Sequence, residues 1–313
     1  MEFDLISRIR QRAASRGDVV LGIGDDAALL QPTPGMQLAV SMDTLNSGVH
    51  FPETTAPADI GWKALAVNLS DLAAMGASPA WCTLSLSLPS PDAAFVDGFL
   101  DGFLALAQQH DVALVGGDTT RGPLSVCVAV HGLVAGGQAL RRDGAREGDE
   151  VWVTGTLGDA AAALDAMLAG AVSDRALRAR LDRPTPRVEA GRALVGLAHA
   201  CIDVSDGLLA DLGHVCSASG VGARIELDAL PASPSLARFA APVRRPWQAG
   251  GGDDYELCFT APPAARDAVA EALEAVAVRA SRIGTITAGS GVVAIDAQGK
   301  PWQPPRRGFA HFA

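Results

Sequence analysis

The sequence predicts a protein of the mixed α/β class, divided into two domains. Segments with the period of a strand alternate with segments of helical period along the whole chain. The chain has 313 residues, and a single hydrophobic core rarely grows that large. A polar, glycine-containing segment at 136–150 lies between two such alternating series. We therefore expect one domain over 1–140 and a second over 141–313.

The first domain is expected to alternate between helices and strands. Pro57 and Gly76 are suited to begin and end a helix, and the loose alternation that ends on Asp43 predicts a strand. A loop containing glycine and threonine should separate the last two strands. The expected order is a helix (3–15), a strand (36–43), a helix (57–76), a strand (81–88), a helix (91–111) and two apolar strands (112–118 and 124–134).

The second domain shows the same alternation. The segment 151–168 is expected to form a strand, a glycine turn and a helix, and 200–220 a strand that runs through an Asp/Ser turn into a helix. Further helices are expected near 173–181 and 187–198. The remainder should mix short strands with one alanine-rich helix at 263–277.

Composition excludes several classes of function. The formal net charge is −10, from 35 acidic and 25 basic residues, and no basic stripe indicates nucleic-acid binding. The five cysteines are scattered and form no C-x-x-C pair, which favours free thiols in a reducing compartment over disulfides or a zinc site. The N-terminus has no signal-peptide core, and glycines, prolines and serines interrupt the uncharged runs at 72–91 and 122–140. We expect a cytoplasmic protein without a membrane span.

Aspartates recur beside apolar or glycine-rich sequence. Adjacent buried carboxylates repel each other and cost several kcal/mol unless they are paired. "GIGDD" is therefore either an exposed turn or the position of a cation, and we favour the cation. Any single aspartate of this kind could be an ordinary turn or cap residue. Together they suit Mg²⁺, which bridges carboxylates to phosphates. They are Asp25-Asp26, Asp43, Asp71, Asp118, Asp203 with Asp206, and Asp253-Asp254.

The usual phosphate-binding motifs are missing from the sequence. Neither lysine lies in a G-x-x-x-x-G-K-[ST] loop, and the H-R-D and D-F-G marks of protein kinases are absent. "GTLGDAA" at 155–161 lacks the G-x-G-x-x-G spacing and is interpreted as a tight turn that begins a helix. If the protein binds ATP, it must therefore hold the phosphates through metal ions and carboxylates.

A set of motifs in fixed order resembles the thiamine-monophosphate kinases, within the superfamily of aminoimidazole ribonucleotide synthetase and selenophosphate synthetase. The resemblance covers essentially the whole chain and implies the two-domain fold of that superfamily, with N-terminal domains that pair in a homodimer. It also implies ATP near the dimer interface and direct, Mg²⁺-dependent transfer of its γ-phosphate to thiamine monophosphate, the last step of thiamine diphosphate synthesis. The motifs are "GIGDDAAL", "SMDTLNSGVHF", "KALAVNLSDLAAMGASPAW", "GGDTTRGP", "RRDGAREGD", "TGTLGDAAAAL", "IDVSDGLLADL" and "GGDDYELCF".

The resemblance also implies site residues. No side chain is expected to act as a catalytic acid, base or nucleophile. Met42 stands where relatives often have Thr, so only its backbone carbonyl could bind metal, and Asp253 stands where they often have Glu. Without the resemblance, an ordinary loop histidine at His50 and a core plug at Phe309 are interpretations of equal weight to a substrate contact. The implied metal ligands are Asp26, Ser41, Met42, Asp43, Asp71, Asp118, Asp203 and Asp206; the ATP contacts are Gly117, Asp118, Arg142 and Ser205; the substrate contacts are His50, Asp253 and Phe309.

Two other functions compete with this interpretation. The first is another ATP-dependent enzyme of the superfamily, of the aminoimidazole ribonucleotide or selenophosphate synthetase type. Selenophosphate synthetases carry a reactive Cys or selenocysteine in an N-terminal segment, whereas the first cysteine here is Cys82. The second is a nucleotide-binding maturation scaffold without catalytic activity. Such relatives tend to end in a cysteine-bearing tail, whereas this chain ends "GFAHFA".

Overall fold

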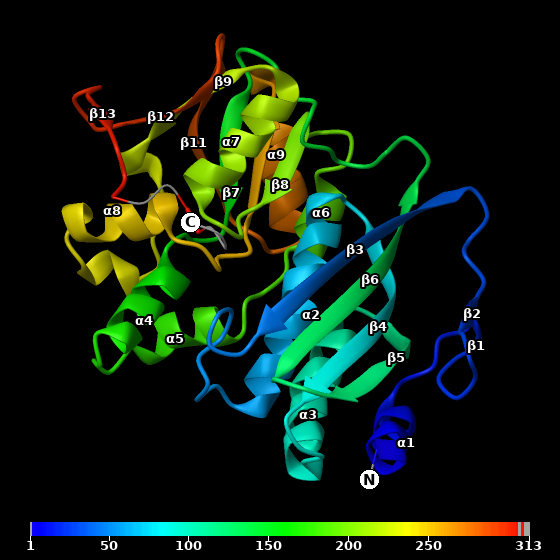
Figure 1. Cartoon of the computed structure of the whole chain (residues 1–313). Helices are drawn as coiled ribbons and strands as arrows, with labels where there is room; N and C mark the ends of the chain where they lie inside the picture. Colours follow the sequence, from blue (N-terminus) through cyan, green and yellow to red (C-terminus); the bar gives the residue numbers. More distant parts are fainter. Residues whose placement is uncertain (1, 306–307, 310–313) are drawn as a thin grey trace. The chain divides into compact units, whose positions relative to one another are not determined.

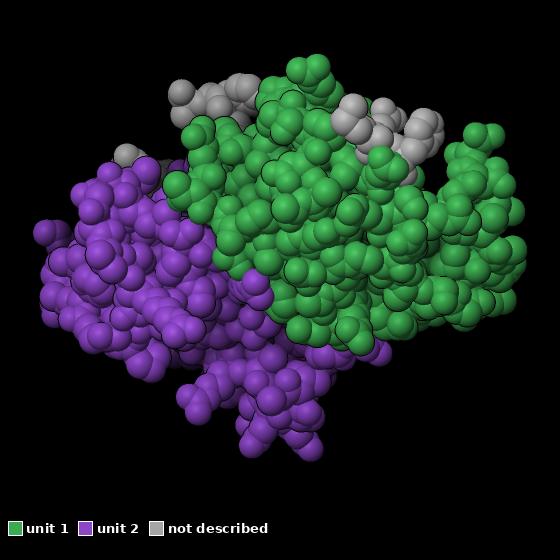
Figure 2. Space-filling view, turned by 90° about the horizontal axis from the view of Figure 1, so that it is seen from below, with its two compact units in different colours: residues 1–72, 77–137 green, residues 73–76, 138–313 purple. Residues whose placement is uncertain are grey.

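The computed structural model describes residues 2–305 and 308–309, so part of the predicted second domain lies outside the described residues. The chain divides into two compact units, one of residues 1–72 and 77–137 and one of residues 73–76 and 138–313 (Figure 2). The sequence placed the division at 140/141; in the structure the main division falls at 137/138. Both units combine helices with a sheet, so the prediction of a mixed α/β protein is confirmed.

The first unit is built on a four-stranded sheet with the order β3-β6-β4-β5. Only the β4–β5 pair is parallel. Helices α2 and α3 lie on one side of this sheet (Figure 1). The elements of this unit are α1 (Glu2–Arg12), β1 (Val19–Leu21), β2 (Leu29–Leu30), β3 (Met36–Asn46), α2 (Pro57–Ala74), β4 (Ser78–Leu88), α3 (Ala93–Gln109), β5 (Ala113–Arg121) and β6 (Ser125–Ala135).

Alternation along β3 decides which side chains face the helices. Successive side chains of a strand point to opposite faces of the sheet. Asp43 pairs with Val128 of β6, which is fully buried, and the backbone N–H of Asp43 donates to the side chain of Asn68 on α2. Val40 and Met42 belong to the opposite face and are 59% and 64% exposed. The inner face of β3 therefore carries Ser41 and Asp43, whereas Val40 and Met42 lie on the outer face.

The second unit is built on a seven-stranded sheet with the order β13-β12-β9-β11-β7-β10-β8. Its core includes Val151, Ile202, Leu212 and Ile225. Short 3₁₀ turns lie at 227–229, 236–238 and 263–265. The other elements are β7 (Glu150–Thr154), α4 (Asp159–Leu168), α5 (Arg175–Asp182), α6 (Val188–Ala193), β8 (Ala200–Asp203), α7 (Leu208–Ser219), β9 (Gly222–Glu226), α8 (Ala241–Gly250), β10 (Leu257–Ala261), α9 (Arg266–Ala275), β11 (Ala280–Thr287), β12 (Gly291–Ile295) and β13 (Pro301–Trp302).

Several local expectations differ from the structure. The strand expected to end at Asp118 continues to Arg121, because β4 pairs with it along that whole length. The polar crossing segment is held within the second unit over 141–142, where the backbone N–H of Cys201 donates to the Arg141 carbonyl and Ser219 donates to the Arg142 carbonyl. Helix α8 was not predicted, because it contains Pro246 in its interior.

No helix in the described part of the chain combines the length and the apolar character needed to cross a membrane.

Candidate functional site

In the first unit, the polar residues of β3 meet the C-terminal half of α2. The Ser41 hydroxyl donates to Oδ2 of Asp71 at 2.5 Å, although the two residues are 30 positions apart. Asp43 is half-buried two positions along the same face of the strand. A hydroxyl and two carboxylates are oxygen ligands of the kind that Mg²⁺ prefers. Asp71 lies inside α2 and neither caps nor ends the helix, so the alternative role of an ordinary cap or turn residue does not apply to it.

Met42 lies between these two residues but points the other way. Its side chain belongs to the outer face of β3 and is largely exposed. Because the side chain is turned away from Ser41 and Asp43, only the backbone carbonyl of Met42 could act as a ligand beside them, as the sequence already indicated.

The turn that contains Asp25 and Asp26 is exposed. It connects β1 to β2, and the Asp26 backbone N–H donates to Oδ1 of Asp25 at 2.8 Å. The expectation that this stretch needs a cation to offset the cost of buried charge is wrong, because both carboxylates lie in solvent. Asp26 as a metal ligand stays a prediction that rests on the resemblance alone.

Gly117 and Asp118 lie on β5, at the opposite edge of the sheet from β3. Gly117 has φ +148°, and a Cβ atom there would lie 1.8 Å from the carbonyl oxygen of Leu84, so only glycine fits. Asp118 is exposed, and its Oδ1 accepts from the N–H of Thr119.

Two cavities lie near β5. Asp118 lines the smaller one, of ≈ 90 Å³. The larger one, of ≈ 510 Å³, lies at the ends of β4 and β5. The larger cavity has the size of a small-molecule site. Its lining residues are Leu5, Leu88, Pro89, Ser90, Pro91, Thr119, Thr120 and Arg121.

His50 lies in the loop that follows β3. Its Nδ1 accepts from the backbone N–H of Asn46 at 2.9 Å, which leaves the ring proton on Nε2 when the ring is neutral. The buried Lys63 donates to the His50 carbonyl at 3.0 Å. These contacts, together with the backbone hydrogen bonds from Val49 and His50 to the Asn46 carbonyl, hold the loop.

In the second unit, backbone hydrogen bonds bring four of the predicted residues together. The N–H of Asp253 donates to the Ser205 carbonyl at 2.8 Å, and the N–H of Phe309 donates to the Asp206 carbonyl at 3.1 Å. Ser205 and Asp206 follow the buried Asp203, which ends β8. Arg142 is exposed in the segment that precedes β7. Sequence positions more than 100 residues apart therefore converge on the loop between β8 and α7.

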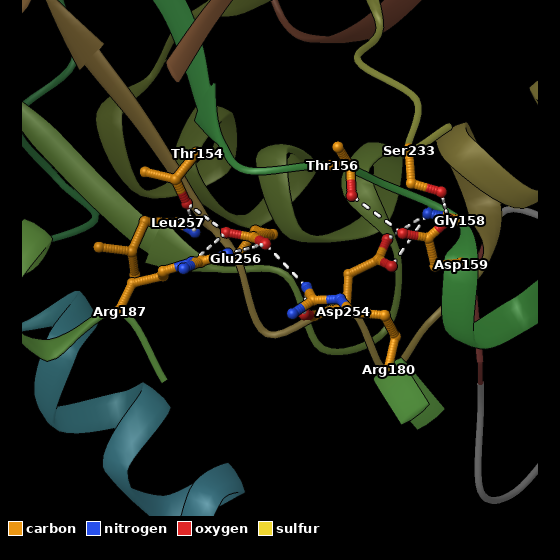
Figure 3. A network of polar contacts seen from close by, with 10 residues as sticks. All are labelled: Thr154, Thr156, Gly158, Asp159, Arg180, Arg187, Ser233, Asp254, Glu256 and Leu257. Atoms are coloured by element: carbon orange, nitrogen blue, oxygen red, sulfur yellow. Dashed lines mark hydrogen bonds and ion pairs between the residues drawn. The ribbon is translucent and has the colours of Figure 1, made fainter. Parts of the chain in front are cut away.

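The two aspartates of "GGDDYE" have different roles. Asp253 is half-buried with φ +68°, and its Oδ1 accepts from the Tyr255 hydroxyl at 3.1 Å. Asp254 is buried, and both of its oxygens accept from the N–H of Gly158 at 2.9 Å (Figure 3). Burial raises the pKa of Asp254 well above its ordinary value, although the Gly158 hydrogen bond opposes the shift. Asp254 thus ties the "GTLGD" turn to the loop that carries Asp253.

A buried ion pair lies beside the hydrogen bonds between Gly158 and Asp254. Glu256 has no exposed surface and accepts from Arg180 and Arg187 at 2.6–2.7 Å (Figure 3). The Thr154 hydroxyl donates to the same carboxylate at 2.7 Å. Burial opposes ionisation of Glu256, but the hydrogen bond and charge of Arg187 and the charge of Arg180 outweigh it and lower the pKa. The network anchors α5 and the start of α6 to β10.

A further carboxylate, Asp211, lies under the loop between β8 and α7. Its Oδ2 accepts from the backbone N–H groups of Ser205, Asp206 and Gly207 at 3.0–3.1 Å. Burial and the neighbouring charge of Asp206 raise the pKa of Asp211 to about 7. Asp211 and Glu256 are not among the residues predicted from the sequence. The signal for Asp211 was its position four residues after the glycine of "SDG", where a first-turn carboxylate can reach back to the loop.

Within a single chain, the described His, Cys, Asp and Glu side chains form no group of three or more that could hold a metal ion. The predicted ligands instead occur in small sets: Ser41 with Asp43 and Asp71, Asp118 by itself on the other sheet edge, and Asp203 with Asp206 in the second unit. Mg²⁺ usually takes one or two carboxylates and fills its remaining positions with water and substrate phosphates. These sets fit an ion that arrives with a phosphate substrate.

Known proteins are similar to this chain over its whole length. The chain matches the N-terminal domain of AIR synthase related proteins over residues 24–134 and the C-terminal domain over residues 146–297. It is 48% identical to thiamine-monophosphate kinase of Escherichia coli K12, over 100% of this chain and 98% of that protein. The chain belongs to the thiamine-monophosphate kinase family.

Solved structures of thiamine-monophosphate kinases share the whole fold. The enzyme from Stenotrophomonas maltophilia K279a has a TM-score of 0.90 and 55% identity, covering 96% of this chain and 98% of that one. A structure described as AaThiL complexed with AMPPCP and TMP has a TM-score of 0.79 and 33% identity, covering 99% and 96%. Hydrogenase maturation protein HypE in complex with ATP is 21% identical at a TM-score of 0.78, covering 97% and 96%, which shows a common fold alone.

Proposed function

We propose that this protein transfers the γ-phosphate of ATP directly to the phosphate of thiamine monophosphate, giving thiamine diphosphate. The observation that carries the proposal is the identity of about half of all positions with thiamine-monophosphate kinase over the full length. One relative was solved with an ATP analogue and TMP together. The maturation scaffold has no comparable support, because its likeness is limited to the fold.

Charge is the main obstacle to this reaction. ATP and thiamine monophosphate together bring roughly five to six negative charges to one place, and the reacting atoms must approach to about 3–3.5 Å. Bound Mg²⁺ would neutralise the phosphate oxygens. In the first unit, we assign Ser41, Asp43 and Asp71 to hold it, with Asp26, the Met42 carbonyl and Asp118 as further ligands. Asp203 and Asp206 are the proposed ligands of the second unit.

Other residues are proposed to bind and orient the two substrates. Gly117, Arg142 and Ser205 would contact ATP; a guanidinium suits phosphate because it donates two parallel hydrogen bonds. On the substrate side, the His50 loop is held by contacts from Asn46 and Lys63. Asp253 and Phe309 are both bonded through their backbones to the Ser205–Asp206 segment. We propose that these three residues orient thiamine monophosphate.

A comparison of two phosphate acceptors, thiamine monophosphate and free thiamine, tests the proposal. With ATP and Mg²⁺, the protein should convert thiamine monophosphate to thiamine diphosphate, detected by chromatography of the products. Free thiamine should be a poor acceptor, because the carboxylate and metal arrangement serves a phosphate nucleophile. Omission of Mg²⁺ should abolish turnover. Equal turnover of thiamine and thiamine monophosphate, or ATP consumption that neither acceptor stimulates, would contradict the proposed function.

We also propose that the active form is a homodimer joined through the first units. The outer face of the edge strand β3 presents a row of exposed apolar side chains, Leu38, Val40 and Met42. Asp43 and Asp118 lie on opposite edges of the sheet, three strand spacings apart, which is about 14 Å. One Mg²⁺ with ligands at about 2.1 Å cannot join them within a chain. A second copy that places its β5 edge beside this β3 edge would bring them together.

Mixing two inactive variants tests this arrangement. Asp43→Asn and Asp118→Asn should each be nearly inactive alone. After subunit exchange, a mixed dimer would contain one intact site, so activity should return to about a quarter of the wild-type value in an isologous dimer. Asp43→Asn mixed with Asp71→Asn is the matched control, because Asp71 bonds to Ser41 of β3. Both residues therefore belong to the same half of the site, and no intact site can form. Without recovery in the first mixture, sharing of the site between copies would be ruled out.

The compartment is part of the proposal as well. All five cysteines are free thiols, and four of them are buried. Burial raises the pKa of the Cys216 thiol to about 11, so it is not a reactive thiolate at neutral pH. Free thiols and an acidic chain support a cytoplasmic enzyme whose partners are ATP, thiamine monophosphate and a second copy, with no nucleic acid or membrane.

A further inference from the structure

Three successive backbone donors of the loop between β8 and α7 are satisfied by a single atom. Oδ2 of Asp211 accepts from the N–H of Ser205 at 3.1 Å, of Asp206 at 3.1 Å and of Gly207 at 3.0 Å. The Asp211 side chain comes from the first turn of α7 and is only 3% exposed. Three hydrogen bonds to one carboxyl oxygen hold these three peptide groups in one orientation.

The acceptors of the same loop are satisfied from other directions. The Ser205 carbonyl accepts from the N–H of Asp253, and the Asp206 carbonyl accepts from the N–H of Phe309. Gly207 has φ +122°, and a Cβ atom there would lie 2.9 Å from the backbone of Gly250, so the loop is tightly packed at that point. The backbone is therefore fixed from both sides, while the side chains of Ser205 and Asp206 stay partly exposed.

The three N–H groups lie in the loop before the helix. Helix α7 begins at Leu208 with Gly207 as its N-cap, and no side chain caps its first turn. Successive backbone N–H groups in a loop can form a binding position for an anion. In this loop the carboxyl group of Asp211 takes that position, and the side chain that stays partly exposed beside it is another carboxylate, that of Asp206. The loop therefore offers a ligand for a cation.

We propose that Asp211 is a positioning residue for the phosphoryl transfer. It orients the Ser205–Gly207 backbone so that Asp206 faces the Mg²⁺ that accompanies ATP. The inference rests on the proposed function only for the identity of the metal-bound substrate. The hydrogen-bond arrangement itself is a property of the free protein.

The test compares Asp211→Ala and Asp211→Asn with a matched pair at Asp174. Asp174 is also a carboxylate that accepts two backbone N–H groups at a helix start, at α5. Removing a residue that orients a metal ligand typically costs 10- to 100-fold in metal affinity. We expect Asp211→Ala to raise the half-saturating Mg²⁺ concentration about 10- to 100-fold. Asp211→Asn, which keeps an acceptor oxygen, should have a smaller effect, and both Asp174 variants should leave the value unchanged.

A second measurement needs neither metal nor turnover. Amide hydrogen exchange of the metal-free protein should speed up in Asp211→Ala at Ser205, Asp206 and Gly207, and through them at Asp253 and Phe309. In Asp174→Ala it should speed up only near the start of α5. An unchanged Mg²⁺ requirement in Asp211→Ala, with activity reduced only in proportion to the folded fraction, would overturn the positioning role. If wild type shows no turnover while the exchange pattern holds, the proposed function fails and the loop assignment stands.

Discussion

Replacing Asp71 with asparagine should lower the turnover number about 100- to 1,000-fold, the usual cost of losing one preorganised electrostatic contact in an active site. Asp71 lies inside α2, half-buried, and accepts from the Ser41 hydroxyl. Asparagine keeps the size and can still accept that hydrogen bond, and its helix propensity is close to that of aspartate. The variant therefore removes a charge and little else. Without metal its melting temperature should equal or slightly exceed that of wild type, because repulsion among neighbouring carboxylates is relieved.

The measurement is turnover across a Mg²⁺ titration, together with the melting temperature of the metal-free protein. Asp101→Asn is the matched control, since Asp101 is a helical carboxylate of the same unit that pairs with Arg12 at the surface. That variant should keep its activity. Near-normal turnover of Asp71→Asn at ordinary Mg²⁺ would remove Asp71 from the metal site.

Replacing Glu256 with glutamine should cost the second unit about 3–5 kcal/mol of stability, the usual effect of removing one partner from a buried ion pair. Glu256 is fully buried between Arg180 and Arg187, and each arginine side chain is 20% exposed. Glutamine has about the same size, but it leaves two guanidinium groups without a counter-charge. Chemical denaturation should show a lower midpoint for the variant, with loss of the ordered contacts around α5 and α6.

The effect should depend on pH in a defined direction. Because the folded-state pKa of Glu256 is lowered from 4.5, its contribution to stability is present above the unfolded-state pKa and is lost as pH falls through the folded-state value. The gap between wild type and Glu256→Gln should thus be widest near neutral pH and shrink below about pH 4.5. Glu189→Gln is the control, because Glu189 pairs with Arg192 on the surface and should cost less than about 1 kcal/mol. Equal losses in both variants, or a gap that does not change with pH, would count against the buried pair.

The class of fold, the order of most elements and the family can be predicted from the sequence alone. These features depend on local periodicity and on motifs within a few dozen residues, both of which can be seen in a linear chain. Sequence reasoning also identified "GGDDYE" and "IDVSDG" as important segments. Nothing in the local sequence distinguishes the buried Asp254 from the half-buried Asp253. The cation expected at "GIGDD" was meant to offset the burial of two carboxylates, and in the structure both are exposed.

Tertiary packing decided what each carboxylate does. Asp253 and Asp254 are neighbours of the same residue type, yet one is half-exposed and the other is buried against Gly158, which lies 96 positions away. Asp71 meets Ser41 across 30 positions, and Glu256 meets its arginines across 69 and 76. Local spacing predicts which face of an element a side chain occupies, but the charge, donors and solvent that it meets there come from segments distant in sequence. The pKa and the role of a carboxylate depend on those surroundings, so only the folded chain separates Asp26 in solvent from Asp211 beneath its loop.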